Sequence, residues 1–487
     1  MKRFDLIFVL LLVMAVLNGQ KRDPRAVSLA SAYTTIADGF YSVGYNPALI
    51  AYQIDKPFMM QVGGIDFGIG NNYLSMAAMR ALSGDTLDND EKSLIINRLD
   101  RSGGLSFEMN GQFAIPGLNY ASGNMAITSN ILYMSSYDIP AGLARLMLEG
   151  NVNNPQIDMT VGYEIMGVHE LGFSFAVPFE SFALGLSLKY LQGLFYMGID
   201  PDSSKANFIT TPTAVYGSGS YFLRQGFGGS GYGLDVGVAT KESNGMRFGV
   251  SLINAFGTIG WNKPSFIKDL LAGKDGKFGN SDDIYHMKWK GEALSDSVAV
   301  LYTYTIDSLR ADNLSSGSLF KSSSTIVKNL DAKGKPKQFK IRYPAILRLG
   351  MSYKNKDLLI SSDLSSGFEN RLFAHSRWRW AVGAELHRFP NAPLRLGFAW
   401  EGMDRTELAM GAGFHGGPVL IDFGFSFRHG MWIHSMKGLN LSLGFTITSF
   451  KGRKEKDGGD SGGPSPVPEK GKSLPGEDQK KPAADRK

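Results

Sequence analysis

Apolar and polar residues alternate with a period of two in segment after segment of this chain. From Trp378 to Leu386 the even-numbered positions are apolar, whereas the odd-numbered positions are mostly small, polar or charged. The alternation returns near residues 394, 408, 419 and 439, and earlier near residues 182, 232, 246 and 347. A period of two predicts β-strands with one apolar and one polar face.

Two arrangements of such strands are open. A soluble sandwich leaves its polar faces in water, whereas a membrane barrel turns its apolar faces to lipid. The polar face is rich in glycine and serine with isolated charges, as a crowded lumen would be, and Trp378, Trp380 and Trp400 lie on the apolar face, as in a lipid-facing girdle. We therefore expect an all-β protein, a transmembrane antiparallel β-barrel of about 14 strands over residues 56–450 with long extracellular loops.

Charges of both signs recur on the face that should line the lumen. Two interpretations remain open: cross-strand ion pairs that neutralise one another, or a path for a polar ligand. The predicted lumen-facing charges are Arg377, Arg379, Glu385, Arg395, Glu401, Glu407, Asp422 and Arg428.

Both ends of the chain differ from this middle part. Lys2 and Arg3 precede an apolar run from Leu6 to Leu17, which predicts a cleaved signal peptide over residues 1–19, with an uncleaved anchor as the alternative. Residues 451–487 hold five prolines, seven glycines and no aromatic residue, so we expect a disordered charged tail. Export and alternation together predict the outer membrane of a Gram-negative-type cell.

Composition excludes several classes of function. The chain has no cysteine, which rules out disulfides, thiolate metal sites and cysteine catalysis. Its net charge is +6, of which +3 (10 Lys and Arg minus 7 Asp and Glu) lies in residues 451–487. The remainder is nearly balanced, so we expect no nucleic-acid partner. A mean hydropathy of -0.10 is too polar for a bundle of membrane helices.

The start of the mature chain resembles a known family. Ala30-Ser31-Ala32-Tyr33 is followed by Asn46-Pro47-Ala48, and later Tyr343-Pro344 leads into an Arg-Leu-Gly strand. These features resemble the FadL-type superfamily of outer-membrane barrels, which includes fatty-acid transporters and PorV-type barrels of secretion systems. The resemblance implies that residues 20–55 form a luminal plug, or hatch, that contains Asn46, Pro47 and Ala48. An ordinary turn before the first strand is the alternative.

Two functions follow from this resemblance. The first is passive passage of hydrophobic small molecules across the outer membrane. The alternative is a PorV-like scaffold or shuttle, with secretion-system or periplasmic proteins as partners. The lipid bilayer is a partner in either case. No nucleophile elbow, HExxH motif or Walker loop occurs in the sequence, so we predict that the protein is not an enzyme.

One loop suggests a metal. Asp275, Asn280, Asp282 and Asp283 lie among glycines, and their side-chain oxygens can bind calcium. Their spacing is not that of an EF-hand, so a solvated acidic turn is the alternative. We expect no other cofactor.

Overall fold

The computed structural model describes most of the chain. The described residues are 23–53, 58–82, 87–150, 155–200, 203–261, 288–289, 292–293, 298–309, 320–327, 339–372, 374–389, 391–402 and 405–449. The predicted signal peptide, the charged tail and the four candidate calcium ligands lie outside these residues.

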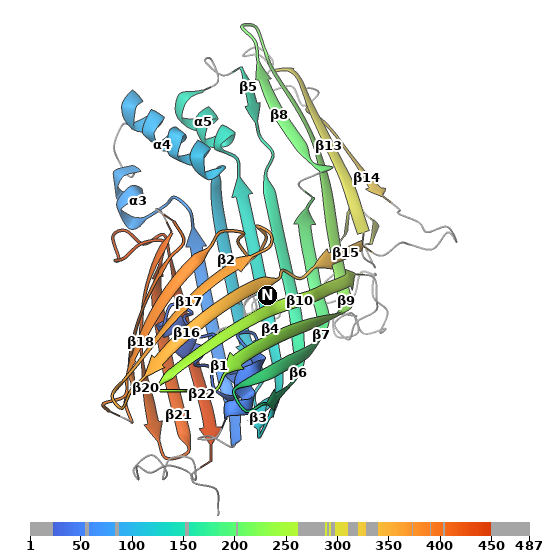
Figure 1. Cartoon of the computed structure of the whole chain (residues 1–487). Helices are drawn as coiled ribbons and strands as arrows, with labels where there is room; N and C mark the ends of the chain where they lie inside the picture. Colours follow the sequence, from blue (N-terminus) through green and yellow to red (C-terminus); the bar gives the residue numbers. More distant parts are fainter. Residues whose placement is uncertain are drawn as a thin grey trace, which may run out of the picture.

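Fourteen strands among the described residues form a closed antiparallel ring (Figure 1). Each strand pairs with the next in the order given below, and β22 pairs with β1 to close the ring. The prediction of an antiparallel barrel of about 14 strands is confirmed. In ring order the strands are β1 (Phe58–Asn71), β2 (Leu105–Ala114), β4 (Met125–Ile139), β6 (Gly162–Pro178), β7 (Phe182–Ile199), β9 (Val215–Thr240), β10 (Met246–Trp261), β16 (Ile346–Lys354), β17 (Leu358–Gly367), β18 (Arg379–Leu386), β19 (Leu394–Trp400), β20 (Thr406–Gly416), β21 (Val419–Arg428) and β22 (Gly438–Thr448).

The connections at the two ends of the ring differ in length. Short turns join β6 to β7, β9 to β10, β16 to β17 and β20 to β21 at one end. The opposite end carries the longer connections, which hold the helices α3 (Met76–Leu82), α4 (Asn89–Ser102) and α5 (Ala141–Glu149). Short turns on one side and long loops on the other are typical of outer-membrane barrels.

Part of the sheet extends beyond the ring at the long-connection end. The first half of β9 pairs on one side with β8 (Lys205–Thr210) and on the other with β13 (Val298–Leu309). The sheet continues through β5 (Gln156–Asp158) beside β8 and β14 (Phe320–Val327) beside β13. Smaller strands are β3 (Asn119–Ser122), β15 (Phe339–Arg342), β11 (Lys288–Trp289) and β12 (Glu292–Ala293).

The wall of the ring is apolar outside and polar inside. On β19, β21 and β22 the side chains of Leu396, Phe423 and Leu443 are exposed, whereas Arg395 and Ser442 face inward and are buried. Trp380 on β18 and Trp400 on β19 are also exposed on the outer side, and Trp378, just before β18, is exposed. This inverts the pattern of a soluble protein and is the pattern of a barrel in lipid. Among the described residues, no helix combines the length and apolarity needed to cross a bilayer.

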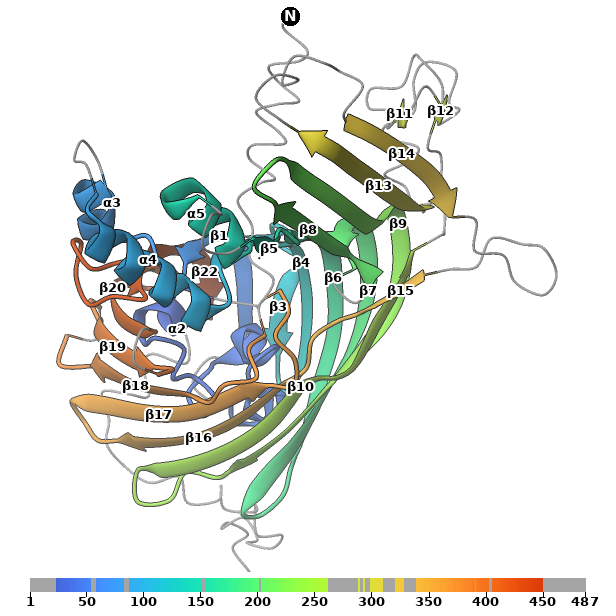
Figure 2. The same ribbon diagram turned by 90° about the horizontal axis from the view of Figure 1, so that it is seen from above.

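Residues 23–53, here called the N-terminal segment, lie inside the ring. Figure 2 shows this segment, in dark blue, enclosed by the strands when the barrel is viewed from above. It contains α2 (Pro24–Ser28), η1 (Gly39–Ser42) and η2 (Pro47–Tyr52), and nearly all of its residues are buried. Its short helices pack on the inner faces of the strands, so residues from one end of the sequence form the interior of the barrel.

Candidate functional site: the barrel lumen

Inward-facing glycines accommodate η2 at the short-turn end. Asn46 caps this helix by accepting a hydrogen bond from the N–H of Ala48 at 3.1 Å, and its Nδ2 donates to the carbonyl of Val238 at 3.0 Å. A Cβ atom at Gly185 would lie 2.1 Å from the nitrogen of Ala48, and one at Gly237 would lie 2.1 Å from Oδ1 of Asn46. Glycine at 185 leaves room for the backbone of η2, and glycine at 237 leaves room for the side chain of its cap, Asn46.

The same relation repeats along the N-terminal segment. A Cβ atom at Gly397 would lie 2.3 Å from the carbonyl carbon of Leu29, and one at Gly424 would lie 2.3 Å from the carbonyl oxygen of Pro24. Glycine on the polar faces of the strands therefore has a specific cause. The strands carry no side chain at the positions where the N-terminal segment approaches their backbone.

Asp363 on β17 anchors the middle of the segment. Its Oδ2 accepts hydrogen bonds from the N–H of Tyr33 at 2.8 Å, the N–H of Thr34 at 2.8 Å and the hydroxyl of Thr34 at 2.6 Å. Nearby, the hydroxyl of Ser361 donates to the carbonyl of Ala32 at 2.7 Å. Hydrogen bonds to a buried carboxylate are among the stronger kinds in proteins, so the segment is held in one position.

A chain of alternating charges joins the segment to the wall. Arg25 contacts Asp38 at 3.0 Å within the segment, and its guanidinium binds both carboxylate oxygens of Glu385, at 2.6 and 3.1 Å. Glu385 also accepts from Nε of Arg395 at 2.6 Å, and Nη1 of Arg395 donates to Asp422 at 2.7 Å. Each charge has a neighbour of opposite sign, which offsets the cost of removing these groups from water.

Six of the eight predicted lumen-facing charges lie inside the ring. They are Arg379, Glu385, Arg395, Glu407, Asp422 and Arg428, and each pairs with another charged group. Glu401 is nearly buried just beyond β19 and pairs with Arg405. The structure differs for Arg377, which precedes β18 and is exposed, because the alternation of the strand begins two residues later.

Some of these charges have partners outside the C-terminal strands, and the sequence pattern did not predict those partners. Arg25 pairs with Glu385, 360 positions away, and Arg428 pairs with Glu108 at 2.9 Å. Neither Arg25 nor Glu108 belongs to a motif. Their roles depend on which strands face one another across the lumen.

Asp23 adds a buried carboxyl at the start of the segment. It caps α2 by accepting a hydrogen bond from the N–H of Ala26 at 2.9 Å. Burial raises the pKa of Asp23 to about 7. The hydrogen bond from Ala26 and the charge of Arg25 act in the opposite direction, but their effect is smaller than that of burial. Asp23 therefore holds its proton more tightly when the segment is in place than an exposed aspartate does.

A buried polar layer lies on the long-connection side of η2. Nζ of Lys189 contacts Asp235 at 2.8 Å and Glu170 at 3.5 Å, and it donates to Oδ1 of Asn254 at 3.0 Å. Asn254 has φ of 52° where the pairing of β9 with β10 is irregular, and its N–H donates to Asp235 at 2.8 Å. The irregularity thus directs a backbone donor to a buried carboxylate.

An apolar cluster follows this layer toward the long-connection end. Its members are inward-facing residues of β4, β6, β7, β10 and β15, together with residues from two connections, and all are buried. The aromatic side chains of Tyr196 and Trp261 contact each other, with their centroids 5.5 Å apart. The lumen of a water-filled barrel is polar, so an apolar inner wall is a distinct feature of this chain. The cluster consists of Leu132, Met134, Met166, Val168, Leu191, Tyr196, Ile259, Trp261, Ile341, Tyr343 and Leu372.

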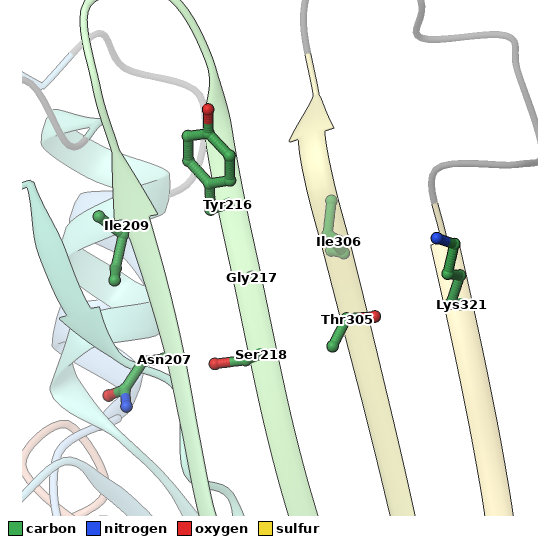
Figure 3. Close-up of a pocket in the computed structure, with 8 residues that line it drawn as sticks. All are labelled: Asn207, Ile209, Tyr216, Gly217, Ser218, Thr305, Ile306 and Lys321. Atoms are coloured by element: carbon green, nitrogen blue, oxygen red, sulfur yellow. The ribbon is translucent and has the colours of Figure 1, made fainter.

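A second hollow lies outside the lumen, on the part of the sheet that extends beyond the ring. Figure 3 shows side chains of β8, β9, β13 and β14 around it. Its lining mixes apolar and polar groups, among them one lysine. The lining residues are Asn207, Ile209, Tyr216, Gly217, Ser218, Thr305, Ile306 and Lys321. Among the residues that the structure describes, no group of three or more acidic or histidine side chains can hold a metal ion.

The chain was compared with known families, curated proteins and solved structures. A family model described as a family of unknown function, DUF5723, matches residues 47–221. The comparison with curated proteins gave no match. The solved structures of the Ralstonia pickettii toluene transporter TbuX and a Pseudomonas aeruginosa FadL homologue are each 12% identical, with a TM-score of 0.45 over 89% of this chain and 99% of theirs. The P. putida toluene transporter TodX is 11% identical, with a TM-score of 0.45 over 88% and 99%.

Proposed function

We propose that this protein is an outer-membrane channel for the passive passage of hydrophobic small molecules. The observation that carries the proposal is the apolar cluster around Tyr196 and Trp261 on the inner wall of the barrel. A lumen that served sugars or ions would gain nothing from this surface, whereas an apolar solute loses its ordered hydration there. The apolar outer surface supports a location in lipid, with the long connections on the outer side.

The N-terminal segment is the plug in this proposal, and Asn46, Pro47 and Ala48 hold it at the short-turn end. The close fit of η2 to Gly185 and Gly237 supports this role. A plug prevents the leak of small polar molecules, so an apolar solute must pass it by displacing the segment or by leaving the lumen before reaching it.

Uptake by liposomes that contain the purified protein tests the proposal. We expect faster entry of an apolar aromatic solute than of a sugar of similar size. Leu191→Asn, in the apolar cluster, should reduce the entry of the apolar solute several-fold. Ser187→Asn, four residues earlier on the inner face of β7, serves as the matched control. Unchanged permeability to every apolar solute tried, relative to empty liposomes, would reject a channel function.

A second candidate function is a PorV-like scaffold for secreted proteins. The sheet that extends beyond the ring favours it, because the hollow of Figure 3 is lined largely by β8, β13 and β14, which are not strands of the ring. Tyr216→Ala and Ile306→Ala should then weaken the capture of a secreted cargo protein by the purified barrel. Equal capture by variants and wild type would exclude this surface as the docking site.

A further inference from the structure

The connection between β17 and β18, residues 368–378 (of which the structure describes all but 373) and here called the strap, folds into the lumen. It turns back on itself at a bridge between Arg371 and Ala374, and Leu372 has φ of 52° at this turn. The side chains of Leu372 and Ala374 are 3% and 1% exposed. A loop on the outside of a barrel would be solvated, so the tip of this turn belongs to the interior.

One arm of the strap is held by β6. Nε of Arg371 donates to Oε2 of Glu164 at 2.7 Å, and its Nη2 contacts Oε1 of the same carboxylate. The hydroxyl of Tyr196 donates to Glu164 at 2.9 Å and fixes that carboxylate from the other side. A two-point guanidinium contact sets both the distance and the orientation of the strap.

The other arm reaches β2. Nε2 of His375 lies 3.4 Å from Oε1 of Glu108, and Oε2 of the same carboxylate accepts from Nη2 of Arg428 at 2.9 Å. In the order of the ring, β17 and β2 are seven positions apart out of 14, which is half of the circumference. The N–H of Gly367 at the end of β17 donates to the carbonyl of His375 at 2.7 Å, so the strap starts from its own strand, and its side chains reach the opposite wall of the lumen.

Between these two attachments, Leu372 packs into the apolar cluster with Tyr196 and Trp261. A solute in this part of the lumen therefore meets the strap as well as the inner faces of the strands. We propose that the strap is the selectivity element of the passage, with Leu372 and the Arg371–Glu164 pair setting the largest solute that can enter. This inference rests on the proposed channel function.

The chemistry of the strap fits a filter for compact apolar solutes. Leu372 offers an apolar contact that a solute can replace at little cost, because one hydrophobic contact is exchanged for another. The ion pair must move for a larger solute, and breaking it exposes Arg371 and Glu164 to an apolar surrounding. Small solutes can thus pass beside Leu372, whereas bulky ones need the pair to open.

Two variants release the strap in different ways. Leu372→Gly removes the apolar side chain and keeps a residue that favours positive φ. Arg371→Gln removes the ion pair with Glu164. Asn244→Gly is the matched control, since Asn244 also has a positive φ, of 51°, but lies in the short turn between β9 and β10. In the double variant Arg371→Glu with Glu164→Arg, the pair is restored with opposite polarity.

The assay is entry of apolar solutes of graded size into liposomes that contain each full-length variant. We expect Leu372→Gly and Arg371→Gln to raise the entry of the largest solutes about fivefold or more, while Asn244→Gly and the charge-swapped double variant match the wild type. Heat-modifiable gel mobility confirms that each barrel is folded. A wild type that passes small apolar solutes, with both strap variants showing the same size limit as Asn244→Gly, would overturn this inference and leave the channel function standing. A wild type that passes no apolar solute would instead overturn the channel function.

Discussion

Gly185 on β7 gives the sharpest test of how the N-terminal segment is held. In Gly185→Ala the new Cβ atom would lie 2.1 Å from the nitrogen of Ala48 and 2.2 Å from the carbonyl carbon of Pro47. Ordinary van der Waals contacts are about 3.5–4.0 Å, so η2 must move by more than about 1 Å. Both contacted atoms belong to backbone, which cannot rotate away as the end of a side chain would. The move would also break the hydrogen bond from Asn46 to the carbonyl of Val238.

Overpacking of this kind costs about 1–3 kcal/mol, which shifts the equilibrium between a bound and a released segment by about 5- to 150-fold. Hydrogen–deuterium exchange in detergent measures the shift directly. The amides of residues 33–48 should exchange faster by this factor, while those of β7 stay protected. Gly63→Ala is the matched control, because nothing lies within 4 Å of a Cβ atom there. Equal exchange in the two variants would refute the role of Gly185 in accommodating η2.

Three further substitutions probe the other contacts of the segment. Glu385→Ala leaves Arg25 and Arg395 without their shared carboxylate, so we expect a loss of about 3–5 kcal/mol in the free energy of unfolding, read from denaturant titrations of heat-modifiable mobility; a change below about 1 kcal/mol would contradict the network. Asp363→Ala removes the acceptor of three hydrogen bonds and should weaken docking of the N-terminal segment by a free energy on the order of 2 kcal/mol. Proteolysis of this segment should then be tenfold or more faster. The pKa of Asp23 is about 7 in the docked segment and 3.8 in the unfolded chain. Protonated Asp23 therefore stabilises docking, and docking should weaken as the pH rises from about 4 to 7. Asp23→Asn should remove this pH dependence, and a wild type whose hydrogen exchange does not change with pH would disprove the assignment.

Local periodicity was sufficient for the barrel wall. A period of two places successive side chains on opposite faces whatever the partner strand is, so the outward direction of Trp380 and Leu396 could be predicted from the sequence alone. The extension of the sheet was not predicted, because β14 is a serine-rich strand without a clear alternation of apolar and polar residues.

The contents of the lumen could not be predicted in this way. Glycine on the polar faces was recognised as a sign of crowding, yet its cause, the fit of the N-terminal segment against Gly185 and Gly397, depends on contacts between residues far apart in sequence. The pairing of Arg25 with Glu385 and the contact between the strap and Glu108 depend on closure of the ring. The sequence by itself determined which side of each strand meets lipid, because that property is local and repeats every second residue. Only the tertiary structure decided what fills the interior, because the partner of an inward side chain depends on the registers of all the strands that close the ring.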